Sequence, residues 1–146
     1  MYGAASYITY VTELVKPLPK SKKRALTSQQ RKQHNFLLGQ IGEEQAAVFL
    51  AQRNFQILDR NFQTKHGEID IVALNLELDE IVFVEVKTRA GEEFGSGSRA
   101  VNWQKKAALR RVAAEYCLEK QIFKDFRFDI ITVVGRNIEH YENITW

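Results

Sequence analysis

The chain has 146 residues, of which 45% are hydrophobic and 27% are charged, a composition typical of a globular domain with its own core. No apolar run is long enough to span a membrane, and residues 1–15 lack the basic start of a secretory signal, so a cytoplasmic location is expected. The single cysteine, Cys117, excludes an intrachain disulfide and a multi-cysteine zinc site, and its apolar surroundings indicate a small packed thiol.

The net charge of +3 is distributed unevenly along the chain. Residues 1–34 hold seven basic residues and one acidic residue, whereas residues 35–146 hold fourteen basic and seventeen acidic residues. We therefore divide the chain into a basic N-terminal extension, 1–34, and a folded domain, 35–146. Both prolines and a lysine-rich run indicate a flexible linker over residues 16–28. Such an arm either binds a polyanion such as nucleic acid or is a solvated tail, and both interpretations stay open.

Residues 33–53 repeat apolar side chains at spacings of three and four, which predicts a helix. Gly39 and Gly42 indicate that another element approaches this helix closely, because glycine costs a helix about 1 kcal/mol relative to alanine. Glu43 lies on the same small, apolar face. We interpret Glu43 as an inward-facing carboxylate in preference to a surface charge.

Short polar connections separate the next apolar segments, which are therefore expected to pair as an antiparallel meander. The predicted strands are 54–62, 68–76 and 81–88. A glycine- and serine-rich loop over 90–98 and an amphipathic helix over 99–120 follow.

A fourth strand over 126–134 and a short strand or tail over 138–146 complete the chain. The helix before the fourth strand is a crossover, which makes that strand parallel to its neighbour. We therefore expect an α/β fold with a small mixed β-sheet flanked by helices, in the order helix, three strands, helix, strand.

Charged residues interrupt the second and third strands where a buried strand is normally apolar. Because burying an unpaired charge is costly, Asp70, Glu85 and Lys87 need partners or a metal ion. Side chains alternate along a strand, so Glu68, Asp70 and Val72 should share one face, and Glu85 and Lys87 should share another. If the two strands pair in register, Asp70, Glu85 and Lys87 converge at one edge of the sheet.

Two carboxylates beside a lysine form a hard oxygen site suited to Mg²⁺ or Mn²⁺. The Val86 carbonyl and the Glu43 carboxylate could complete the ligand set around Asp70 and Glu85. Such a metal activates water and polarises a phosphoryl oxygen, and Lys87 would stabilise the developing charge. The pattern therefore predicts a metal-dependent nuclease site. The alternative is a surface ion pair between Glu85 and Lys87, with Asp70 capping a turn.

Several short motifs carry a more specific resemblance. They are Gly39-x-x-Gly42-Glu43-x-x-Ala46, Arg60-Asn61-Phe62, Gly67-Glu68-Ile69-Asp70, Val82-Phe83-Val84-Glu85-Val86-Lys87-Thr88-Arg89, Phe94-Gly95, Ala100-Val101, Lys105 and Arg127-Phe128-Asp129. Together these motifs resemble the bacterial YraN-like (UPF0102) family of uncharacterised proteins, and the Asp-x14-Glu-x-Lys spacing resembles the PD-(D/E)xK nucleases.

That family is similar to archaeal Holliday junction resolvases, so the resemblance implies a restriction-endonuclease-like fold. It places Glu43, Asp70, Glu85 and Lys87 in the four catalytic positions. It covers residues 35–146, implies no demonstrated substrate and carries nothing over to the basic extension.

Basic and aromatic residues near the predicted second helix are secondary candidates. The candidate DNA-binding residues are Arg89, Lys105, Lys106 and Arg110. A solvated surface explains them equally well. Trp103 could stack on a base or pack in the core. We interpret Arg127 with Asp129 as a structural ion pair, and Glu68 as a residue that fixes the turn in preference to a metal ligand.

The leading hypothesis is a Mg²⁺- or Mn²⁺-dependent DNA endonuclease that acts on branched or damaged DNA. Junction cleavage requires two opposed cuts, so a homodimer is expected, with the edge strand at 138–141 or the apolar part of the extension as candidate interfaces. One alternative is a catalytically idle nucleic-acid-binding protein or DNA-processing adaptor. Another is an interaction module whose acidic pocket holds a structural cation.

Overall fold

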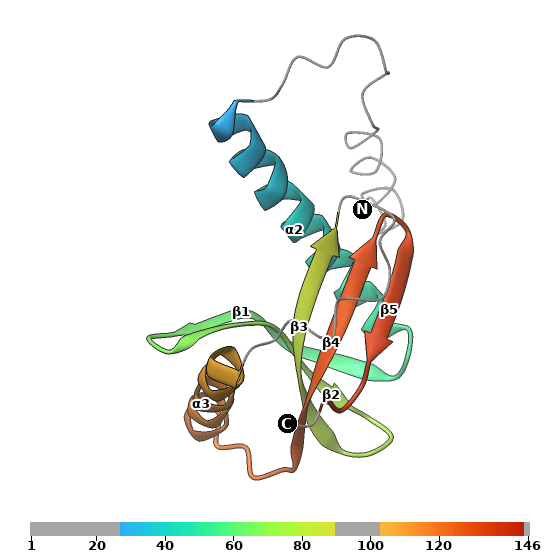
Figure 1. Ribbon diagram of the computed structural model, residues 1–146. Coiled ribbons are helices and arrows are strands. Elements are labelled where there is room, and N and C mark those ends of the chain that lie inside the picture. Colours follow the sequence, from blue (N-terminus) through green and yellow to red (C-terminus); the bar gives the residue numbers. More distant parts are fainter. Residues whose placement is uncertain (1–26, 90–102, 145–146) are drawn as a thin grey trace, which may run out of the picture. The chain divides into compact units, whose positions relative to one another are not determined.

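The computed structural model describes residues 27–89 and 103–144, which form helices and strands in the expected order (Figure 1). The elements are α2 (Ser28–Ala51), β1 (Phe55–Thr64), β2 (Gly67–Asn75), β3 (Glu80–Arg89), α3 (Trp103–Glu119), β4 (Phe126–Val134) and β5 (Asn137–Tyr141). The predicted loop over 90–98, the first residues of the predicted second helix and residues 1–26 lie outside the described residues. No helix in the described ranges is long and apolar enough to cross a membrane.

The sheet has five strands in the order β1-β2-β3-β4-β5. β1, β2 and β3 form the predicted antiparallel meander. β4 pairs with β3 in parallel, from Ile81 with Phe126 to Arg89 with Val134, and β5 pairs antiparallel with β4. This topology confirms the mixed α/β fold and the helical crossover inferred from the sequence. β5, the expected edge strand, pairs only with β4 and begins at Asn137.

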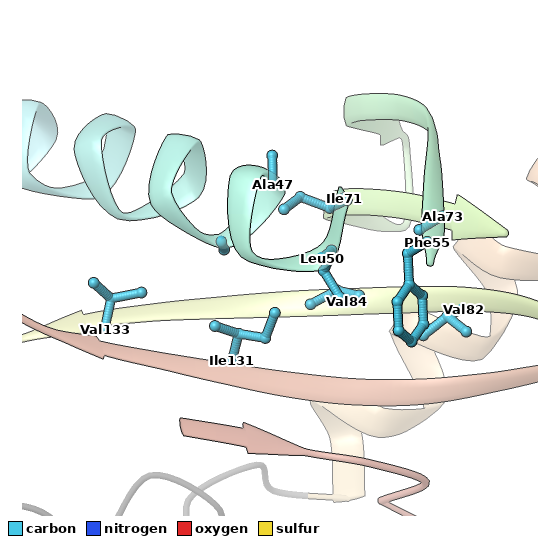
Figure 2. Packing of buried hydrophobic residues seen from close by; sticks show 10 residues of the cluster. Ala47, Leu50, Phe55, Ile71, Ala73, Val82, Val84, Ile131 and Val133 are labelled. Carbon is cyan, nitrogen blue, oxygen red and sulfur yellow. The ribbon is translucent and has the colours of Figure 1, made fainter. Parts of the chain in front are cut away.

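Apolar side chains fill both faces of the sheet. Figure 2 shows Ala47 and Leu50 of α2 lying over Ile71 and Val84 of the sheet. The buried core on the α2 side is Ala46, Ala47, Leu50, Phe55, Ile71, Ala73, Val82, Val84, Ile131 and Val133. The buried core on the α3 side is Ile69, Val72, Ile81, Phe83, Leu109, Val112, Ala113, Tyr116 and Phe128. A sheet covered on both faces explains why its central strands are almost continuously apolar.

Cys117 of α3 packs partly buried against the core on the α3 side, as expected for a small apolar side chain. Burial raises the pKa of this thiol. A raised pKa suppresses the nucleophilic thiolate, so the interpretation as a packing residue holds.

α2 begins at Ser28, five residues before the start predicted from apolar spacing. The Thr27 hydroxyl accepts a hydrogen bond from the Gln30 N–H at 3.2 Å, and the Gln30 side chain accepts one from the Thr27 N–H at 3.0 Å. This reciprocal pair is a capping box, which satisfies two backbone donors at the helix start. The predicted linker over residues 16–28 therefore ends in a helix cap, and residues 29–34 of the proposed extension are helical.

Residues 38–146 form one compact unit, and within it the two glycines of α2 have different surroundings. A Cβ atom added at Gly42 would lie 1.8 Å from Oγ1 of Thr88 on β3, so this glycine permits a close approach between helix and sheet. A Cβ at Gly39 meets no atom of residues 27–89 or 103–144 within 4 Å, so the close approach expected there is wrong for this part of the chain.

We predict opposite effects for alanine at these two positions. Gly42→Ala should lower the free energy of unfolding by about 1–3 kcal/mol, because the added methyl group overlaps a stiff, β-branched side chain. Gly39→Ala should raise it by about 0.5–1 kcal/mol, because alanine is the better helix former and the space is open. Urea denaturation of both variants tests the pair. Equal destabilisation, or no rescue of Gly42→Ala by Thr88→Ala, would show that the Gly42–Thr88 contact does not set the helix position.

Candidate active site

The sheet divides in the middle of β3, where the pairing between β2 and β3 ends at Ile71 and Val84. Beyond this point the β1–β2 hairpin runs beside α3, while β3 continues alongside β4 (Figure 1). We call this divergence the fork. Asp70 on β2 and Glu85 on β3 are the first residues beyond the last pair, so the register brings the two predicted carboxylates to the fork together.

A local twist in β2 directs Asp70 toward β3. Ile69 packs in the core on the α3 side and Ile71 in the core on the α2 side, although residues two apart in a strand normally share a face. The strict alternation expected over residues 68–72 is therefore wrong at Asp70. On β1, opposite this twist, Asn61 has a φ of 52°, a left-handed conformation that asparagine tolerates better than most residues.

The Asp70 carboxylate takes the place of a backbone partner at the fork. Its Oδ2 accepts a hydrogen bond from the Val86 N–H at 2.6 Å. The pKa of Asp70 is raised from 3.8 to about 7. Burial is the largest cause and the carboxylates of Glu85, Glu43 and Glu68 add to it, while the hydrogen bond from Val86 acts in the opposite direction. A positive charge at this position would relieve both the burial cost and the repulsion.

Glu85 has cationic neighbours on the other side of the fork. Its carboxylate forms an ion pair with the Lys105 ammonium of α3, and only 14% of the Glu85 side chain is exposed. Burial lowers the pKa of Lys87, the Glu85 carboxylate raises it, and the charges of Lys105 and Arg89 lower it. The two sides of the fork therefore differ in charge. Carboxylates dominate the surroundings of Asp70, whereas ammonium groups lie near Glu85.

Glu43 is half-buried on α2 and contributes to the acidic field at Asp70, as its predicted inward orientation requires. Glu68 is exposed, and its carboxylate accepts a hydrogen bond from the Gln63 side chain at 3.0 Å, which joins the two strands of the β1–β2 hairpin. Within residues 27–89 and 103–144, no three His, Cys, Asp or Glu side chains are arranged to hold a metal ion.

The basic candidates divide into two groups. Arg89 and Lys105 act electrostatically on Lys87 and so belong to the surroundings of the fork. Lys106 and Arg110 lie one turn apart on α3, where Lys106 is half-buried and Arg110 is exposed. The side chain of Trp103 lies outside the described part of the chain, so both of its interpretations remain predictions.

Arg127 and Asp129 form the structural pair inferred from the sequence. The guanidinium donates two hydrogen bonds to the Asp129 carboxylate, at 3.0 and 3.2 Å, and both residues are buried on β4. His140 Nε2 lies 2.8 Å from the same carboxylate, which also accepts the Asn143 N–H at 2.8 Å. Burial raises the pKa of Asp129, but these hydrogen bonds outweigh burial and hold that pKa below its usual value. The cluster ties β4 to β5 and the chain after it.

Two features of the fork are missing from the sequence-based prediction. The ion pair between Lys105 and Glu85 joins residues twenty positions apart on a helix and a strand, and no periodicity signals such a contact. The twist at Asp70 has a weak signal in Asn61, because asparagine is uncommon within strands and tolerates left-handed conformations.

Fold and site together define a small mixed α/β protein with acidic and basic side chains at a fork in its sheet. The sequence profile of Uncharacterised protein family UPF0102 matches residues 42–133, a range that contains Glu43, Asp70, Glu85, Lys87 and Lys105. The chain belongs to this family.

UPF0102 proteins from three bacteria illustrate the similarity. The protein of Alkaliphilus oremlandii is 45% identical over 117 residues, which cover 75% of this chain and 97% of that relative. The protein of Caldicellulosiruptor saccharolyticus is 47% identical over 98 residues, covering 66% and 80% of the two chains. The protein of Dictyoglomus turgidum is 37% identical over 102 residues, covering 69% and 85%.

Proposed function

We propose that this protein is a divalent-cation-dependent DNA endonuclease whose active site is the fork. Asp70 and Glu85 are the proposed metal ligands, Glu43 supports them from α2, and Lys87 is the proposed catalytic lysine. One observation carries the proposal. Asp70 and Glu85 follow directly after the last pair of β2 and β3, and the electrostatic neighbours that raise the pKa of the half-buried Asp70 are also carboxylates. Such an arrangement is costly without a cation, and a divalent cation would offset the cost.

The donor chemistry fits Mg²⁺ or Mn²⁺. These hard cations are commonly bound by only one or two protein carboxylates, with water and substrate phosphate completing the shell, so a closed cage of three acidic side chains is not required. The Val86 N–H points at Asp70, and the N–H and carbonyl of one strand residue point to the same side of the strand. The Val86 carbonyl is therefore directed toward the fork, in agreement with its proposed role as a further ligand.

When bound, the divalent cation would lower the pKa of a water molecule and polarise a phosphoryl oxygen. The protein supplies orientation and charge. The Val86 N–H fixes the Asp70 carboxylate through one oxygen and leaves the other available. Lys87 shares the Glu85 side of β3, and its ammonium would stabilise the negative charge that develops on the scissile phosphate. Glu43 adds negative charge that favours cation entry.

The substrate class rests on resemblance. The Asp-x14-Glu-x-Lys spacing and the mixed sheet are similar to those of PD-(D/E)xK nucleases, and the family is similar to archaeal Holliday junction resolvases. Branched DNA is therefore the proposed substrate, a symmetric dimer is the proposed working state, and Arg89, Lys105, Lys106 and Arg110 are the proposed phosphate contacts. A direct comparison of branched and linear DNA tests this substrate assignment.

The test is cleavage of labelled four-way junction, flap and linear duplex DNA by the full chain, with Mn²⁺, with Mg²⁺ and with EDTA. We expect cation-dependent cleavage, with the junction cut faster than the linear duplex. Cleavage of all three substrates at equal rates would support the proposed nuclease activity and contradict the proposed preference for branched DNA. No cleavage of any substrate, at any protein concentration that saturates DNA binding, would contradict the nuclease.

A catalytically idle nucleic-acid-binding protein is the second candidate, and the ion pair between Glu85 and Lys105 favours it, because one proposed metal ligand is already neutralised. This candidate predicts DNA binding that weakens with salt and persists in Asp70→Asn, without cleavage. Binding and cleavage measured on the same preparations separate the two functions.

A further inference from the structure

The ion pair between Lys105 and Glu85 lies at the proposed metal site, and the proposed role of Lys105 as a phosphate contact does not explain this pairing. Lys105 reaches the fork from α3, and 47% of its side chain is exposed, whereas Glu85 is largely covered. The charge of Glu85 also acts on Lys87, and Lys87 is in turn affected by Lys105. The Glu85 carboxylate therefore acts on both ammonium groups.

At Asp70 the potential is negative, because Glu43, Glu68 and Glu85 all add negative charge there. A divalent cation held by Asp70 and Glu85 would offset this negative potential, and it would compete with Lys105 for the Glu85 carboxylate. Lys87 is fixed on the same strand as Glu85 and shares its face, so it stays close in either case. Lys105 sits on a separate helix and has a long, partly exposed side chain, so it can leave.

We propose that Lys105 is an internal counter-cation that competes with the divalent metal for the Glu85 carboxylate. This inference rests on the proposed function, and it adds regulation of the same site. In the metal-free protein Lys105 stabilises Glu85, and metal binding displaces its ammonium group toward solvent. The site then binds metal more weakly than a site in which both carboxylates have no ammonium partner, because metal binding must also break the ion pair.

Calorimetric titration of the full chain with Mn²⁺ tests the competition without relying on cleavage. Lys105→Met should tighten Mn²⁺ binding on the order of fivefold, as expected for loss of a partly exposed ion pair. Lys105→Arg keeps the charge and should bind Mn²⁺ within about twofold of the natural protein. Arg111→Met removes a positive charge from an exposed position of α3 and controls for the general electrostatic effect, with an expected change below about twofold.

The outcomes are distinguishable. Unchanged Mn²⁺ affinity in Lys105→Met, or equal tightening in Lys105→Met and Arg111→Met, would overturn the competition and leave the proposed nuclease standing. Absence of Mn²⁺ binding in the natural protein and in every variant would overturn the proposed metal site itself. Tightening confined to Lys105→Met, and abolished by adding Asp70→Asn, would support both.

Discussion

Asp70→Asn should lower the rate of Mn²⁺-dependent DNA cleavage by at least about 100-fold while leaving the protein folded. The amide still accepts the hydrogen bond from the Val86 N–H but is a much weaker metal ligand than a carboxylate. Metal-assisted charge stabilisation contributes several kcal/mol, so the rate should fall at least about 100-fold. Lys87→Met should lower the cleavage rate by about 10²- to 10³-fold for a different reason, because it removes charge stabilisation and retains metal binding. Cleavage rates under single-turnover conditions measure both.

The chain offers matched controls at the other end of β3. Asp79 and Lys124 form an exposed ion pair where the β2–β3 turn meets the segment before β4. Asp79→Asn and Lys124→Met make the same chemical changes away from the fork, so both should cleave at nearly the natural rate. Equal cleavage by Asp70→Asn and Asp79→Asn would place the chemistry elsewhere.

The same Asp70→Asn substitution should stabilise the metal-free protein, and by more as the pH rises. The pKa of Asp70 is raised from 3.8 to about 7 by burial and neighbouring carboxylates, so the folded state holds a proton that the unfolded state releases. For a carboxyl with a raised folded pKa, stability is lost as the pH rises from the unfolded pKa to the folded pKa. The difference in free energy of unfolding between the Asp70→Asn variant and the natural protein should therefore grow by roughly 2–3 kcal/mol between about pH 5 and pH 8.

Urea denaturation in EDTA at both pH values measures this gain, and Asp79→Asn should show no comparable increase. Saturating Mn²⁺ at the higher pH should stabilise the natural protein and not the Asp70→Asn variant, because only the former binds the ion. A protein more stable without its key carboxylate illustrates the usual conflict between a functional site and folding stability. A pH-independent effect of Asp70→Asn would mean that the carboxylate is not held in a costly environment.

Most of the fold can be predicted from the local pattern of apolar, polar and turn residues in the sequence. Apolar runs and turn residues locate β1 to β4 within one or two residues, whereas the last predicted segment, 138–146, extends five residues past the end of β5. The crossover helix makes β3 and β4 parallel for general reasons of chain connection. Apolar periodicity predicts a start of α2 that is five residues too late, because the first turns of the helix are polar and their signal is the capping box of Thr27 and Gln30. Gly39 and Gly42 look equivalent in the sequence, yet only the second faces Thr88.

The site is predictable to the extent that its geometry follows strand register. In-register pairing of β2 and β3 places Asp70 beside Glu85, and charges within apolar strands reveal that both need partners. The divergence of the two strands, the twist at Asp70 and the ion pair of Lys105 depend on how α3 and the β1–β2 hairpin pack, which short-range pattern does not encode. The roles of Glu43, Asp70, Glu85 and Lys87 in catalysis remain predictions.

A crystal structure of the protein with Mn²⁺, using the anomalous signal of the metal, tests the central claim most directly. The proposed site predicts one strong peak in the fork, about 2.1 Å from a carboxylate oxygen of Asp70 and of Glu85, with Lys105 moved away from Glu85. A peak held by other residues, or an empty fork with the ion pair between Lys105 and Glu85 intact at saturating Mn²⁺, would contradict it.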